Sequence, residues 1–61
     1  MNFIVIAKIG TEQIRAVVRA DCKSDARYIF GQHMQPRETK IQSIKRIDGM
    51  PKKYASLPVM E

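Results

Sequence analysis

The chain is poor in the residues that build cross-linked or metal-bound cores. Its 61 residues include one cysteine, Cys22, and one histidine, His33. A single cysteine excludes an internal disulfide, and one cysteine with one histidine falls short of a zinc ligand set. At this length only about 60% of the unfolded surface is buried on folding. A domain this small needs another source of stability, and we expect self-association or a tightly packed tail to supply it.

Long apolar runs and targeting patterns are also missing. No run approaches the roughly eighteen residues of a membrane span, and residues 1–9 lack the basic segment and cleavage site of a signal peptide. We therefore expect no membrane contact and a reducing, cytoplasmic setting.

Catalytic and cofactor motifs are absent as well. The three glycines are isolated, so there is no glycine-rich phosphate loop. Cys22 and His33 are eleven residues apart, about three helical turns, and cannot touch within one helix. We interpret Cys22 as a small hydrophobe at a helix start and His33 as a partly buried residue near a helix end. The sequence predicts a protein that is not an enzyme and uses no cofactor or metal.

One segment, residues 20–34, has the periodicity of a helix. Ala26, Ile29, Phe30 and His33 recur at helical spacing and form one apolar side.

The ends of this helix are predicted from its flanking residues. Asp21 or Ser24 is the expected N-cap, because short polar side chains satisfy the first free N–H groups. Gly31 and the Gln35–Pro36 pair are expected to end the helix, since a residue before proline is pushed out of the helical region.

Three segments have the composition of strands. Residues 3–9 and 14–20 are predicted to form a hairpin that turns at Gly10–Thr11. Residues 37–48 carry an isoleucine at every third position, which favours a strand with a bulge; a helix over 38–48 is the alternative.

Together these elements predict an α+β fold. Residues 1–48 form a single ββαβ domain, with a three-stranded antiparallel sheet in the order 2-1-3 and one helix packed on one face. The apolar first strand suits the central place in this order. Residues 49–61 form either a tail packed across the open face of the sheet or a mobile arm.

The hairpin register predicts two different sheet faces. A hairpin loop of either two or four residues places odd positions of the first strand beside even positions of the second. One face is then pure core, expected beneath the helix: Phe3, Val5, Ala7, Ile14, Ala16 and Val18. The other face mixes apolar and basic side chains: Ile4, Ile6, Val17, Lys8, Arg15 and Arg19.

The basic residues are the candidate binding residues. Eleven Lys and Arg against six Asp and Glu give a net charge of +5, which favours polyanionic partners. Apolar area beside arginine is typical of a protein interface. We therefore predict a partner-binding surface made of Arg15, Arg19, Lys8, Ile6, Val17, Lys45 and Lys53.

One further pattern covers about residues 14–49 and consists of Ala20–Asp21, Ser24, Ala26, Arg27, Ile29, Ile41, Ile44, Ile47 and Gly49. In these positions the chain resembles a type I-F anti-CRISPR family of small phage and mobile-element proteins. The resemblance implies a non-enzymatic protein that binds the RNA-guided surveillance complex and interferes with target DNA hybridisation through basic side chains. The same layout also resembles a small archaeal-type large-subunit ribosomal protein.

Two main functional hypotheses are consistent with these features. The first is a non-catalytic inhibitor or modulator that docks onto a host protein or ribonucleoprotein complex that handles nucleic acid. The second is a small basic module that binds RNA or DNA directly. A homodimer is a third possibility, because an uncovered apolar sheet face invites a second copy.

Overall fold

Three long antiparallel strands form the body of the sheet in the computed structural model, which describes residues 1–35 and 37–61. The central strand β1 (Asn2–Ile9) lies between β2 (Glu12–Arg19) and β3 (Lys40–Ile47). The predicted hairpin is confirmed, as is the third strand beside the first. Residues 40–47 form a strand, so the helical alternative for this segment is wrong.

A two-residue loop connects β1 and β2. Ile9 pairs with Glu12, and Gly10 has a φ of 59°, a left-handed conformation that glycine adopts without strain. The second strand consequently begins at Glu12, two residues before the predicted start.

The predicted bulge in β3 is confirmed. Its register against β1 shifts between Ile41 and Ser43, which leaves Gln42 as the extra residue. Because of this shift, Ile41 and Ile44 both face the helix although they are three residues apart. Ile47 lies beyond them on the opposite side.

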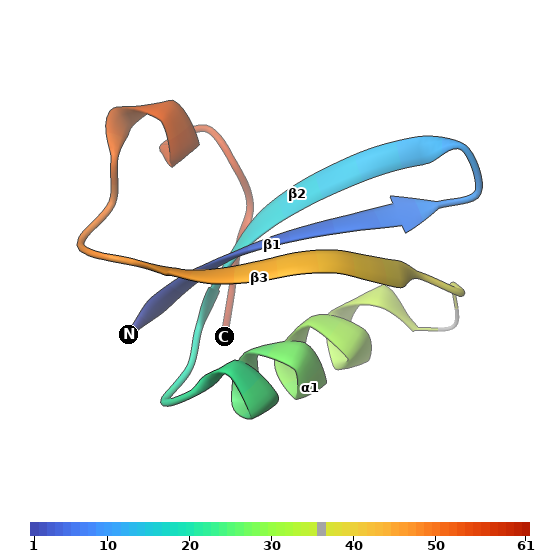
Figure 1. The fold of residues 1–61 in the computed structure, drawn as a ribbon, viewed down its shortest axis with the longest axis horizontal. Coiled ribbons are helices and arrows are strands. Elements are labelled where there is room, and N and C mark those ends of the chain that lie inside the picture. The colour runs from blue at the N-terminus through green and yellow to red at the C-terminus, as the bar shows by residue number, and fades with distance from the viewer. Residues whose placement is uncertain (36) are drawn as a thin grey trace.

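The helix α1 (Lys23–Met34) packs on one face of the sheet (Figure 1). The predicted core is confirmed, with Ile14 half-buried at its margin. Its buried members come from β1, β2 and α1: Phe3, Val5, Ala7, Ala16, Val18, Ala26 and Phe30.

The start of α1 differs from the prediction. Cys22 is the N-cap residue and makes no side-chain capping bond, whereas Asp21 precedes it and Ser24 lies inside the first turn. The main-chain N–H of Ala26 bonds to the Cys22 carbonyl at 3.0 Å. Burial of Ala26 against the sheet, rather than a polar cap, therefore sets where the helix begins.

The end of α1 agrees better with the sequence. The helix ends at Met34, and Gln35 follows in an extended conformation with its N–H bonded to the Gly31 carbonyl. Gly31 thus lies inside the helix. Pro36, the other predicted terminator, is outside the described residues.

The three-stranded antiparallel prediction was wrong in one respect, because the tail adds a fourth strand. The short strand β4 (Val59–Met60) pairs in parallel with β2, so the sheet is mixed and has the order β3-β1-β2-β4. Two residues after a proline are too few to show a strand period in the sequence.

The rest of the tail crosses the sheet on the side opposite α1. It contains a short 3-10 helix, η1 (Lys52–Tyr54), and Figure 1 shows α1 and η1 on opposite sides of the sheet. Two hydrogen bonds fix its course: Asn2 Nδ2 donates to the Gly49 carbonyl at 2.8 Å, and the Val17 N–H donates to the Pro58 carbonyl at 2.9 Å.

This crossing explains why the second face of the sheet is covered. Ile4 and Val17 point away from α1, yet they are only 3% and 0% exposed. Tyr54 and Leu57 of the tail are half-buried. Of the two arrangements predicted for residues 49–61, the structure has the packed tail.

We expect Phe30→Ala to lower the free energy of unfolding by about 3 to 5 kcal/mol, because a fully buried aromatic leaves a cavity. Tyr28→Ala is the matched control, since Tyr28 is on the same helix and 67% exposed. Urea unfolding followed by circular dichroism measures both. Equal losses in the two variants would contradict the assignment of the buried helix side.

Deletion of residues 50–61 is expected to destabilise the protein by a few kcal/mol. Burial of one Val or Ile side chain stabilises by about 1.5 to 3 kcal/mol, and the deletion uncovers Ile4 and Val17. Urea unfolding and sedimentation of the truncated chain test this. A truncated chain that stays monomeric with the parent's unfolding midpoint would show that the tail does not cover this face.

Candidate functional site

The side of the sheet opposite α1 is strongly basic. Strand pairing places five basic residues there, and among the described strand residues on this side none is acidic. They come from all three long strands: Lys8, Arg15, Arg19, Lys40 and Lys45.

The tail divides this side into a covered half and an open half. Ile4 and Val17 lie in the covered half. The open half lies toward the hairpin turn. We call it the basic patch and define it as Lys8, Gln13, Arg15, Lys40 and Gln42, all of which are exposed.

Two lysines face each other at the centre of the basic patch. Lys8 on β1 pairs directly with Lys40 on β3, and directly opposed residues have Cβ atoms about 4.5 to 5.5 Å apart. Like charges in this arrangement destabilise a sheet. An anion bound between the two ammonium groups would remove that repulsion.

An amide bridge spans the patch. Gln13 on β2 donates from Nε2 to Oε1 of Gln42 on β3 at 3.1 Å, although β1 lies between these strands. The bulge makes this contact possible, because it adds Gln42 to β3. The bridge holds hydrogen-bonding groups beside Lys8 and Arg15.

One carboxylate lies at the rim of the patch. Glu38, just before β3, lines a hollow together with Lys8, Gly10 and Lys40. The ion pairs formed within the described part of the chain, Arg19–Glu61 and Arg46–Asp48, do not involve it. With two lysines and one carboxylate, the hollow has a net positive charge that an external anion can neutralise.

The structure brings only some of the predicted binding residues together. Lys8 and Arg15 are exposed in the basic patch, with Ile6 half-buried between them. Val17 is fully buried, so it cannot contact a partner while the tail is in place.

The other three predicted residues lie away from the patch. Arg19 forms an ion pair with Glu61 at 3.0 Å, which joins β2 to the last residue of the tail. Lys45 is exposed on β3, opposite the covered Ile4. Lys53 lies in η1 with its Nζ 5.1 Å from the centre of the Tyr54 ring.

Sequence reasoning missed the two glutamines and did not single out Lys40. The spacing of the isoleucines predicted a bulge but not its position. Only the register, with Gln42 as the extra residue, places Lys40 opposite Lys8 and brings Gln42 within reach of Gln13.

The two candidate reactive residues are exposed rather than buried. Cys22 is free and exposed at the helix start, and His33 is exposed with its Nε2 3.2 Å from the main-chain oxygen of Glu61. Cys22 lies at the helix start as predicted, but its exposed thiol does not pack as a hydrophobe, and the interpretation of His33 as partly buried was wrong. The contact joins the end of α1 to the end of the tail.

Neither a metal-ligand cluster nor a membrane-spanning helix occurs in the described residues. Across residues 1–35 and 37–61, no group of three or more His, Cys, Asp and Glu side chains is arranged to hold a metal ion. In the same residues, no helix has the length and hydropathy needed to span a bilayer.

No family model, curated protein or solved structure matches this chain. The resemblance to the type I-F anti-CRISPR family therefore stays a prediction.

The like-charge pair gives a testable effect on stability. We expect Lys40→Gln to raise the free energy of unfolding by about 0.2 to 1 kcal/mol at low salt, because it removes repulsion with Lys8. The gain should vanish at high salt, which screens exposed charges. Lys45→Gln, on the same strand but opposite Ile4, is the control and should show no gain. If both variants gained the same free energy of unfolding, repulsion between Lys8 and Lys40 would not be the cause.

Proposed function

We propose that this protein is a non-catalytic binding protein whose basic patch contacts the sugar-phosphate backbone of RNA or DNA. The observation that supports it best is a sheet side with five basic strand residues and, in the described strands, no acidic one. Lys8 and Lys40 stand directly opposed at its centre. Phosphate groups are the ligands that a cluster with this excess of positive charge binds most readily.

The covered half of the sheet favours phosphate over a protein surface as the ligand. An interface with another protein was predicted because Ile4, Ile6 and Val17 were expected among the charges. Ile4 and Val17 lie beneath the tail, so the open surface consists mainly of cations and amides. Cations and amides position a nucleic-acid backbone by charge and hydrogen bonding.

A second candidate function keeps the same patch but changes the partner. A non-catalytic inhibitor or modulator, encoded by a phage or mobile element, would dock onto a host nucleic-acid-handling complex in the manner of anti-CRISPR proteins. Ile6 favours it, because this half-buried isoleucine lies beside the patch and pairs with Arg15. Arginine beside apolar area is common in protein interfaces.

The compartment that we propose for either function is the cytoplasm. Cys22 is an exposed free thiol, which persists in reducing compartments. A homodimer through the second sheet face is not proposed, because the tail occupies the covering position that a second copy would need.

Charge reversal of the patch tests the proposed function. We expect Lys8→Glu with Arg15→Glu to weaken binding to a short single-stranded RNA and to a DNA duplex at least tenfold in fluorescence anisotropy. The slope of log affinity against log salt should also fall by about 0.7 to 0.9 for each phosphate group that the variant no longer neutralises.

A second double variant is the matched control. Lys23→Glu with Arg27→Glu changes the net charge equally but lies on α1, on the other side of the sheet. Nearly unchanged binding is expected for it. If both double variants lost the same affinity for nucleic acid, the total charge of the protein, and not the position of its cations, would explain binding. If the parent bound neither nucleic acid but recovered a host complex through Lys8 and Arg15, the second candidate would replace the first.

A further inference from the structure

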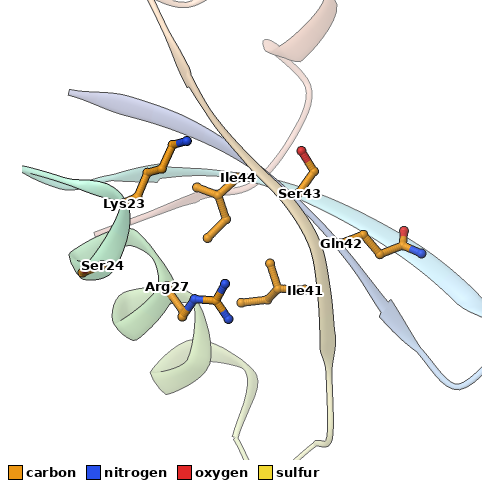
Figure 2. Close-up of a pocket in the computed structure, with 7 residues that line it drawn as sticks. All are labelled: Lys23, Ser24, Arg27, Ile41, Gln42, Ser43 and Ile44. Atoms are coloured by element: carbon orange, nitrogen blue, oxygen red, sulfur yellow. The ribbon is translucent and has the colours of Figure 1, made fainter.

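A groove separates α1 from β3 on the helix side of the sheet. Figure 2 shows its walls, with Lys23 and Arg27 extending from the helix toward Ile41 and Ile44 on the strand. The groove is a hollow of about 460 Å³, completed by Ser24, Gln42 and Ser43. The groove shares Gln42 with the basic patch but opens on the helix side of the sheet, and its cations, Lys23 and Arg27, are not part of the patch.

One wall of this groove is a free sheet edge. The order β3-β1-β2-β4 leaves the outer edge of β3 without a strand partner within the described chain. The strand is eight residues long, whereas the opposite edge is partly closed by β4. Outward-facing N–H and C=O groups of an edge strand can pair with the backbone of another extended segment.

The floor and the rim of the groove suit different kinds of ligand side chain. Ile41 and Ile44 are half-buried and form an apolar floor. Lys23 and Arg27 are exposed, one helical turn apart, and are absent from the ion pairs of the described residues. An arginine beside a lysine suits a carboxylate, which the guanidinium group binds through two hydrogen bonds.

The charge of β3 argues against a second copy as the occupant. Lys40, Lys45 and Arg46 are exposed on this strand, which has no acidic residue. Pairing two β3 strands edge to edge would bring together two groups of three positive charges, and like charges across a strand pair are destabilising. An acidic segment would meet attraction along the whole edge.

We propose that the groove between α1 and β3 binds an extended acidic peptide of a partner protein by adding it as a strand to β3. Successive side chains of an added strand alternate between its two sides. The set on the helix side enters the groove, where a central apolar side chain lies over Ile41 and Ile44 and the acidic side chains before and after it in that set reach Lys23 and Arg27. The recognised sequence therefore combines small apolar residues with aspartate or glutamate, and contains no proline.

The test uses a fluorescein-labelled heptapeptide, Thr-Asp-Thr-Val-Thr-Asp-Thr, in which the valine and both aspartates lie on one side of an added strand. We expect it to bind the parent protein and to shift the backbone amide NMR signals of residues 40–47 more than those of β1. Lys23→Glu with Arg27→Glu should raise the Kd at least tenfold, with an unchanged circular dichroism spectrum. The patch variant Lys8→Glu with Arg15→Glu has the same net charge and should bind within about twofold of the parent.

Three further results would overturn the proposal. A peptide with proline in place of the valine and of each threonine lacks backbone N–H groups on both edges of the strand, so its equal binding would exclude strand addition. A single-stranded oligonucleotide that displaces the peptide and loses affinity in the Lys23→Glu, Arg27→Glu variant would assign the groove to nucleic acid. A dimer of the parent that dissociates when the peptide binds would assign it to a second copy.

Discussion

The fold depends on covering β1 on both faces. This strand alternates between two apolar sets: Phe3, Val5 and Ala7 lie under α1, and Ile4 lies under the tail. The described residues of this 61-residue chain form one long helix, which covers one face, so the second face requires another segment. The tail meets this need by crossing from the β3 edge to the β2 edge, where β4 anchors it.

The length of the tail also decides where a binding surface is left. The crossing covers Ile4 and Val17 but not the hairpin end of the same face, which remains open with Lys8, Arg15 and Lys40. Arg19, one of the predicted binding residues, forms an ion pair with Glu61 of the tail. Exposed ion pairs of this kind contribute about 0 to 1 kcal/mol, so burial of the apolar residues contributes most to holding the tail.

The strand β3 takes part in both proposed surfaces. Lys40 and Gln42 belong to the basic patch, whereas Ile41 and Ile44 form the floor of the groove beside α1. The bulge at Gln42 makes this division possible, because it changes which side of the sheet the later residues face. The two surfaces differ in character, one being cations and amides on a sheet face and the other a free edge above an apolar floor.

The sequence predicted the features that depend on local periodicity. The apolar run of residues 3–9 and the alternation in residues 14–20 were enough to predict the hairpin and its core, and the isoleucine spacing predicted a bulge. Contacts between distant segments were not predictable in the same way. No sequence signal near Cys22 indicates that packing of Ala26 sets the helix start. Val59 and Met60 are too few residues to show the alternation of a strand, and they form one only by pairing with β2.

The candidate site shows the same limit. The charges of Lys8 and Arg15 could be placed on one face from the hairpin register alone, but Val17 was placed among them because the tail's path was unknown. Lys40 and Gln42 required the position of the bulge as well. The pairing register between distant strands and the path of the tail over the sheet decide which side chains a partner can reach. The secondary-structure propensity of each segment does not.

Amide hydrogen exchange of Val17 tests the central claim most directly. Its N–H bonds to the Pro58 carbonyl at 2.9 Å only if the tail lies along β2 as described. We predict that this amide exchanges as slowly as the inner amides of β1, since both then open only when the sheet unfolds. Exchange of the Val17 amide at the rate of a free chain, while the β1 amides stay protected, would contradict a tail fixed across the second face.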